Sequence, residues 1–326
     1  MSYLKTTRDF YKDAALSPDE GLCCTTSPSW SFPGLKVPSI MNRMNYGCGT
    51  TVHPADLAGN PTVLYVGVGG GLELLQFTYF SRKPGGVIGV DPVPEMLEAC
   101  RRNFAEAAGM NDWLQEDFVS LRSGDALNLE IEDSSVDVAA QNCLFNIFKE
   151  DDLKKALAET CRVLKPGGRF VLSDPVTPVP LPDRLTGDDR LRAMCLSGSL
   201  TYQRYVELMG EAGFGTIQIR ARRPYRMLDR KRYGLEEPVL LESLEVAAIK
   251  TKSCCGLEVF TGRTAIYHGE EEYFDDGAGL SLTRDMPVMI SDRRAEQLRT
   301  AGHPDLTITE PTWHFAGGSG GGSGCC

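Results

Sequence analysis

Several features that would mark particular classes of protein are missing from this sequence. Its 326 residues contain no stretch near the roughly 18 uncharged apolar residues that a membrane helix needs, and the charged N-terminus lacks the apolar segment of a secretory signal. Only four histidines occur, and no cysteines follow Cys-x-x-Cys spacing, which argues against a structural zinc finger. The 34 Lys and Arg are outnumbered by 44 Asp and Glu, which argues against unspecific nucleic-acid binding. We therefore expect a cytoplasmic protein that binds neither membrane nor nucleic acid.

Cysteine, in contrast, is abundant. The chain has 11, a high count for the cytoplasm, where thiols stay reduced and disulfides are mostly transient or catalytic. Six form three adjacent pairs and five stand alone: Cys23-Cys24, Cys254-Cys255 and Cys325-Cys326, then Cys48, Cys100, Cys143, Cys161 and Cys195. Cys100 and Cys161 lie in predicted helices, and we expect them to fill space in the core, since buried cysteine often behaves as a small hydrophobic residue.

The order of segments predicts an α/β fold. Residues 1–60 should form one helix near 2–15 and then an irregular arm with several prolines. Over 61–224, short apolar β-branched runs alternate with amphipathic helical segments, which predicts a doubly wound, Rossmann-like parallel sheet. The alternation is lost in 225–316, where we expect a smaller α+β region. A flexible Gly/Ser tail, 317–326, ends in Cys-Cys.

The first predicted strand runs into a glycine-rich loop. Gly67, Gly69 and Gly71 lie between "VLYV" and a predicted helix, where glycines let the backbone approach a ligand at the helix N-terminus. Leu72 stands where the dinucleotide fingerprint would have its third glycine, which disfavours NAD. Asp91 ends the second strand, 20 residues after Gly71, and is placed to accept hydrogen bonds from both hydroxyls of a ribose.

Further candidate ligand-binding residues follow the later segments. Asp125, in "SGDAL", could accept a hydrogen bond from the exocyclic amine of an adenine, with Ala126 beside it. We also assign Met96, in the helix after the second strand, and Asn142, near the end of the fourth, to the same site. Taken singly, a glycine loop, an acid that ends a strand and a "KPGG" turn are weak signals. The specific signal is their order and spacing.

That order, closed by "RVLKPGGRFVLSDP", resembles the class I S-adenosylmethionine-dependent methyltransferases. The resemblance implies S-adenosylmethionine as the cofactor and no metal cofactor. One residue departs from the pattern. The family usually carries an acid two residues before the first glycine, and this chain has Tyr65 there.

Three cysteines from separate segments are candidates for a common site. Cys143 ends the fourth strand, Cys195 lies in the connection after the fifth, and Cys48 lies in the arm before the sheet. Open parallel sheets bind ligands beyond the carboxyl ends of their strands, so we expect these thiols to converge over the methyl donor.

The contexts of these cysteines narrow the resemblance. "NYGCG", "QNCLFNIF" and "AMCLSGSLTYQRY" around a methyltransferase core resemble the arsenite methyltransferases. The resemblance implies that Cys48, Cys143 and Cys195 are the catalytic, arsenic-binding thiols, and that an earlier arsenic ligand is Cys24 or its neighbour Cys23. The long C-terminal region and "GLCCTTSPSW" are most similar to the branch associated with arsenosugar biosynthesis, which implies a radical S-adenosylmethionine enzyme as pathway partner.

The chemistry of arsenic suits such thiols. Trivalent arsenic is soft and keeps a lone pair, so thiolates are its natural ligands. Methyl transfer to that lone pair requires the two atoms to be held about 3–3.5 Å apart in line, and it needs no general base. Two thiols can return two electrons by closing a disulfide, which thioredoxin or glutathione must reopen. We expect Cys48, in a loop loosened by glycines, to be the mobile thiol.

The sequence also allows two other interpretations of the function. The chain could methylate another small-molecule acceptor, with incidental cysteines, or it could be a non-catalytic thiol protein that sequesters soft metals. A further hypothesis concerns Cys325-Cys326, which could capture trivalent arsenic or help to reduce the active-site disulfide, although "GGSGGGSG" is also typical of artificial linkers.

Overall fold

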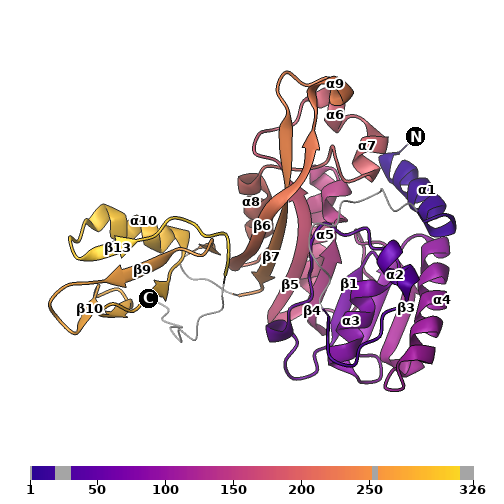
Figure 1. The fold of residues 1–326 in the computed structure, drawn as a ribbon, viewed down its shortest axis with the longest axis horizontal. Coiled ribbons are helices and arrows are strands. Elements are labelled where there is room, and N and C mark those ends of the chain that lie inside the picture. Colours follow the sequence, from indigo (N-terminus) through magenta and orange to yellow (C-terminus); the bar gives the residue numbers. More distant parts are fainter. Residues whose placement is uncertain (1, 19–30, 252–255, 316–326) are drawn as a thin grey trace.

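An eight-stranded sheet organises most of the protein, for which a computed structural model describes residues 2–18, 31–251 and 256–315 (Figure 1). Its strand order is β3-β2-β1-β4-β5-β7-β6-β8. The strands are β1 (Val63–Val66), β2 (Val87–Asp91), β3 (Val119–Ser123), β4 (Val136–Asn142), β5 (Leu164–Val176), β6 (Thr216–Leu228), β7 (Val239–Ile249) and β8 (Glu258–Phe260). Strands β1 to β5 pair in parallel, and β7 is antiparallel to both of its neighbours.

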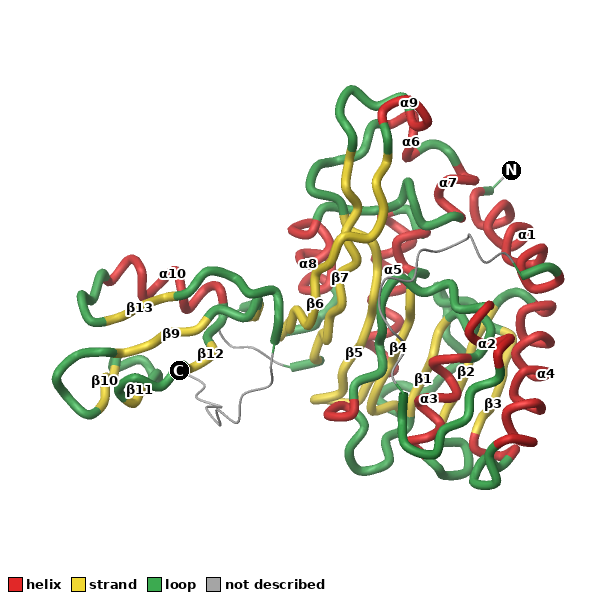
Figure 2. The backbone as a smooth tube through the Cα atoms, in the orientation of Figure 1, coloured by secondary structure: helices red, strands yellow, loops and turns green. Residues whose placement is uncertain are grey.

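Helices cover both faces of this sheet (Figure 2). They are α1 (Tyr3–Leu16), α2 (Ser39–Arg43), α3 (Leu72–Ser81), α4 (Pro94–Met110), α5 (Glu150–Val163), α6 (Asp183–Thr186), α7 (Asp189–Ala193), α8 (Tyr202–Glu211) and α9 (Arg230–Tyr233). Side chains of β1 alternate between two cores: Val63 and Tyr65 pack with α3 and α4, and Leu64 and Val66 with α5 and α8. The doubly wound α/β fold predicted from the sequence is therefore confirmed. Within the described ranges, every helix is too short or too polar to cross a bilayer.

The expected boundary at residue 224 is wrong, because it falls inside β6. Strand β7 lies between β5 and β6 and pairs with both, so the main sheet continues through Ile249, and β8 is added beside β6 after that. Antiparallel neighbours need no crossover helix, and only the four-residue α9 stands between β6 and β7. The alternation of strands and helices therefore stops in the sequence while the sheet continues in space.

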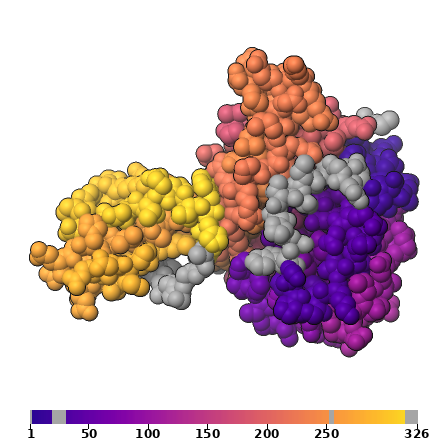
Figure 3. Space-filling model, in the orientation of Figure 1, coloured from indigo at the N-terminus to yellow at the C-terminus, as the bar shows by residue number. Residues whose placement is uncertain are grey.

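A smaller α+β unit follows the main sheet. Strand β9 (Thr264–Tyr267) is the centre of a three-stranded sheet with β12 (Val288–Met289) and β13 (Leu306–Ile308). A hairpin of β10 (Tyr273–Asp275) and β11 (Ser281–Thr283) and the helix α10 (Asp292–Ala301) complete it. It has its own small core and projects as a lobe from the rest of the molecule (Figure 3). The predicted Gly/Ser tail and the three cysteine pairs lie outside the described residues.

Candidate cofactor and substrate site

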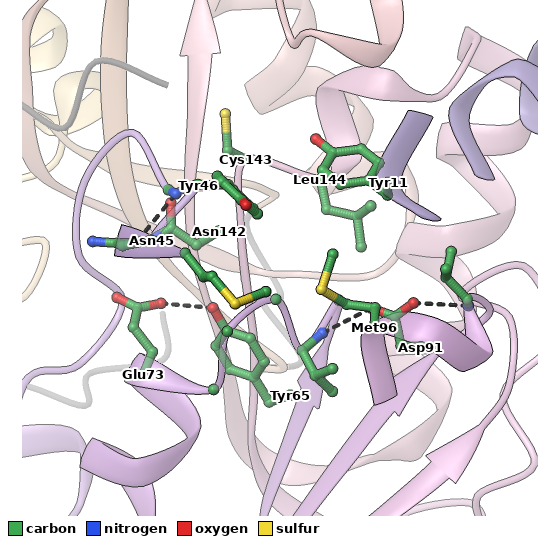
Figure 4. A pocket seen from close by; sticks show the side chains of 18 of the residues that line it. Tyr11, Asn45, Tyr46, Tyr65, Glu73, Asp91, Met96, Asn142, Cys143 and Leu144 are labelled. Carbon is green, nitrogen blue, oxygen red and sulfur yellow. Dashed lines mark hydrogen bonds between the residues drawn. The ribbon is translucent and has the colours of Figure 1, made fainter. Parts of the chain in front are cut away.

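A pocket of about 790 Å³ opens beyond the carboxyl ends of β1, β2 and β4 (Figure 4). One wall is the glycine loop 67–71 with Asp91 and Met96, and another is the segment 142–144 after β4. Residues 44–47, α1 and the first turn of α3 contribute further lining. The site thus lies where open α/β sheets generally bind ligands.

The glycine loop has the backbone conformation that glycine alone adopts freely. Gly67, Gly69 and Gly71 have positive φ angles of 81°, 50° and 88°, and α3 begins directly after Gly71. The amino end of α3, with Leu72 and Glu73, therefore lines the pocket and favours a negatively charged ligand group such as a carboxylate.

Asp91, the last residue of β2, is held in place by two backbone hydrogen bonds. Its two oxygens accept hydrogen bonds from the backbone N–H groups of Val93 (2.9 Å) and Val68 (3.0 Å). Burial raises the pKa of this carboxyl to about 6, against the lowering effect of those two donors. Since each carboxylate oxygen can accept a second hydrogen bond, Asp91 is suited to the paired hydroxyls of a ribose.

The structure brings six of the eight cofactor candidates together. The residues that line the pocket are Gly67, Gly69, Gly71, Asp91, Met96 and Asn142. Asp125 and Ala126 are not part of the lining. Asp125 accepts a hydrogen bond from Arg8 of α1 (2.8 Å), and Ala126 is buried in the core shared with α5. Arg8 lies at the pocket instead, a contact between segments 117 residues apart that sequence spacing could not reveal.

Cys143 forms part of the pocket wall at a strained turn. Its φ angle is 59°, in the left-handed region that few residues other than glycine occupy. The side chain of Gln141 supports the turn, because its amide oxygen accepts from the N–H of Leu144 (2.8 Å). The amide nitrogen of Gln141 in turn donates to Asp174 (2.5 Å), which is completely buried. Strain held by a buried network is common at functional positions.

Cys195 lies directly behind Cys143. Its thiol donates a hydrogen bond to the carbonyl oxygen of Cys143 (2.9 Å), and the hydroxyl of Tyr11 is 3.8 Å from the same sulfur. Cys195 also has a left-handed φ angle, 57°. Two of the three predicted thiols are therefore neighbours, although their segments are 52 residues apart.

Cys48 is buried and is not part of the pocket lining. Its N–H donates to the side-chain oxygen of Asn142 (3.0 Å), and its sulfur lies 3.4 Å from the hydroxyl of Ser173. The glycines on either side of Cys48 are closely packed in this conformation. A Cβ on Gly47 would lie 2.5 Å from the Asn142 side chain, and one on Gly49 would lie 2.3 Å from the Ser173 hydroxyl, so both glycines permit close packing.

Cys48, Cys143 and Cys195 are all buried free thiols, and Cys48 and Cys195 each contact the segment 142–143. Within the described ranges, no three His, Cys, Asp or Glu side chains are arranged to hold a metal ion. A three-thiolate arsenic site therefore requires some rearrangement from this conformation, and the fourth candidate, Cys24 or Cys23, lies outside the described residues. Cys100 and Cys161 are buried, and burial raises the pKa of both thiols, as suits core positions.

Comparison with known proteins agrees with this geometry. A family model described as a methyltransferase domain matches residues 64–172. An arsenite methyltransferase of Halobacterium salinarum is 34% identical over 176 residues, and one of Aquipseudomonas alcaligenes is 33% identical over 216 residues. The chain is therefore similar in sequence to two arsenite methyltransferases. A crystal structure of an arsenic (III) S-adenosylmethionine methyltransferase from Chlamydomonas reinhardtii has the same fold, with a TM-score of 0.58 at 22% identity over 86% of this chain and 95% of that one.

The sequence similarity covers only part of each protein. The alignments span 54% and 64% of this chain, and 43% and 60% of the Halobacterium and Aquipseudomonas proteins. The alignments and the family model show that the chain contains a methyltransferase domain. The similarity to the Chlamydomonas structure shows the class I methyltransferase fold.

Proposed function

We propose that this protein transfers methyl groups from S-adenosylmethionine to thiolate-bound trivalent arsenic, giving mono- and dimethylated products. The observation that carries the proposal is the position of Cys143, on the wall of a nucleotide-type pocket with the Cys195 thiol bonded to its carbonyl oxygen. The two relatives named as arsenite methyltransferases support the same acceptor.

The residues of the pocket suit the parts of such a cofactor. Asp91 would accept from the ribose hydroxyls, and the amino end of α3 would face the carboxylate of the methionine part. When bound, S-adenosylmethionine supplies a methyl group on a positively charged sulfur. Cys143 and Cys195 would bind arsenic as thiolates and present its lone pair to that methyl.

The transfer also changes the oxidation state of arsenic. The carbon–sulfur bond of the cofactor would break as the carbon–arsenic bond formed from the lone pair of arsenic, and arsenic would pass formally from As(III) to As(V). Two thiolates can return the two electrons by forming a disulfide, for which Cys48 is the third thiol near segment 142–143. An external thiol reductant, thioredoxin or glutathione, would then restore the thiols.

The wider biological context follows from the resemblance. Detoxification or arsenosugar biosynthesis would both use such an activity, the second with a radical S-adenosylmethionine enzyme downstream, and a cytoplasmic location would supply the reductant. These assignments form part of the proposal.

The test is a methylation assay with cysteine variants. The protein is incubated with arsenite, S-adenosylmethionine and glutathione, and the arsenic species are separated by chromatography with element-specific detection. We expect Cys143→Ser and Cys195→Ser each to lower the rate by about 100-fold or more, because the acceptor loses a ligand that positions it. Cys161→Ser, in α5 away from the pocket, is the matched control and should retain most of the activity.

The alternatives give different results in the same assay. Release of S-adenosylhomocysteine only with another small acceptor, and unchanged by Cys143→Ser, would indicate a different methyltransferase. Arsenite binding without S-adenosylhomocysteine release would indicate a sequestering protein. The absence of any methylated arsenic would overturn the proposal.

A further inference from the structure

A second buried carboxylate, that of Glu73, lies on the far side of the pocket from Asp91 (Figure 4). Glu73 lies in the first turn of α3, is 7% exposed and lines the pocket. Figure 4 shows it beside Tyr65, on the opposite side of the cavity from Asp91. Tyr65 is the residue that stands where the resemblance implied an acid.

Neutral donors converge on Glu73. Its Oε1 accepts from the backbone N–H of Thr51 (2.8 Å), and its Oε2 accepts from the hydroxyls of Thr51 and Tyr65 (2.8 Å each). The side chain of Asn142 is a further uncharged partner. These donors orient the carboxylate but do not neutralise its charge.

Among the residues that the structure describes, no positively charged side chain pairs with this carboxylate. In the part of the chain that the structure describes, the partners of Glu73 are all uncharged, and burial raises the pKa of its carboxyl. The one arginine in the pocket lining, Arg8, is paired with Asp125. An ionised carboxylate taken out of water without a cation is costly, and a cationic ligand group would remove that cost.

We propose that Glu73 is the residue that binds the amino group of the cofactor's methionine part, through an ion pair between its carboxylate and the ligand's ammonium. This inference rests on the proposed binding of S-adenosylmethionine. The ammonium and the ribose would then be recognised by two acids on opposite walls, Glu73 and Asp91, with the carboxylate end of the ligand at the start of α3 between them. Where the family usually carries an acid at the position of Tyr65 in β1, this chain would use Glu73 in α3, and the Tyr65 hydroxyl would orient it.

The test compares two ligands that differ only in the amino group. Binding of S-adenosylhomocysteine and of its deaminated analogue is measured by calorimetry with the whole protein. We expect the wild type to prefer S-adenosylhomocysteine by about 10- to 100-fold, the range for a hydrogen bond between charged groups. Glu73→Gln, of the same size but uncharged, should lose that preference and bind the analogue as the wild type does.

Tyr65→Phe is the matched control, because it removes one donor to Glu73 and keeps the charge. It should retain the preference for the amino group to within about threefold. If Glu73→Gln does not fold, Glu73→Asp replaces it; this variant keeps the charge but withdraws it by one methylene, and an intermediate preference is expected.

The outcomes separate this inference from the proposed function. Equal loss of affinity for both ligands in Glu73→Gln, or an unchanged preference in either Glu73 variant, would show that Glu73 only shapes the pocket, and would overturn the inference while S-adenosylhomocysteine binding by the wild type still stood. A wild type that binds neither ligand would instead contradict the proposed function itself, and this inference with it.

Discussion

Asp91 shows how a single buried acid can make ligand binding depend on pH. Its carboxyl has a pKa of about 6 in the folded protein because it is buried. Protonation would occupy one of the two oxygens that could accept from a ribose hydroxyl. Binding of the nucleoside part should therefore require the ionised form.

We expect the affinity for 5′-methylthioadenosine to fall as the pH drops below about 6, by up to about tenfold per pH unit. This ligand has the ribose but no amino group, so Glu73 does not contribute to the effect. Asp91→Asn should bind weakly and without this pH dependence, as measured by calorimetry between about pH 5 and pH 8. The same slope in wild type and variant would assign the titration to another group.

Cys143 and Cys195 differ from the other described cysteines in backbone conformation. Their φ angles are 59° and 57°, in the left-handed region where a non-glycine residue is strained. The strain is retained because neighbouring hydrogen bonds hold both turns, including the one from the Cys195 thiol to the Cys143 carbonyl. Backbone conformation thus marks two of the three cysteines that the sequence context singled out, and Cys48 is the third.

The turn after β4 depends on a buried network between three elements. Asp174 of β5 accepts from Gln141 of β4 and from the hydroxyl of Tyr205 of α8, both at 2.5 Å. Burial raises the pKa of Asp174 from an ordinary 3.8 to about 7. Between these values the folded state keeps a proton that the unfolded state has released, so this group makes the protein less stable as the pH rises.

Asp174→Asn cannot titrate and should remove that dependence. We expect its free energy of unfolding, relative to the wild type, to increase between about pH 4 and pH 7, by on the order of a few kcal/mol. Urea unfolding at a series of pH values measures it. Tyr205→Phe is a control that leaves Asp174 titratable, so its stability should still fall as the pH rises. It should be less stable than the wild type by about 1–2 kcal/mol, and by more at higher pH, because the Tyr205 hydroxyl lowers the pKa of Asp174. A constant difference between wild type and Asp174→Asn would refute the assignment.

The C-terminal lobe is joined to the main sheet by a small aromatic contact. The guanidinium carbon of Arg222 in β6 lies 4.4 Å from the centre of the Trp313 ring. The ring of Tyr202 in α8 meets the Trp313 ring edge to face, with the ring centres 5.2 Å apart. Close by, the N–H of Phe315 donates to the carbonyl oxygen of Ile219 (2.9 Å). Strand β8, which pairs with β6, and the His314 ring, whose Nδ1 lies 3.1 Å from the carbonyl oxygen of Arg220, provide further connections.

Trp313→Ala should loosen the lobe and leave the pocket intact. Loss of the ring contacts should cost about 1–3 kcal/mol and raise the rate of proteolysis between the lobe and the sheet several-fold. Limited proteolysis followed by mass spectrometry identifies the cleavage sites. Binding of S-adenosylhomocysteine should stay unchanged, and a parallel loss of binding would show that the lobe supports the pocket. Trp113→Ala, which removes a ring that contacts Tyr79 and Arg82, gives a comparison for the loss of a tryptophan away from the lobe.

The sequence alone determined the features that depend on neighbouring residues. Runs of buried β-branched residues, amphipathic helices and the glycines before α3 were predictable, because each reflects the burial of a segment's own faces or a local backbone requirement. The position of Asp91 at the end of β2 followed in the same way. So did the burial of Cys100 and Cys161.

Only the tertiary structure decided which distant segments meet. Arg8 of α1 reaches Asp125, Thr51 and Tyr65 orient Glu73, and β7 enters the sheet beside β5. None of these contacts leaves a periodic signal, since a hydrogen bond or strand pairing between remote residues depends on how whole elements pack. For this reason the loop, the strand-end acid and the thiols could be found in the sequence, whereas the acid on α3 required the fold.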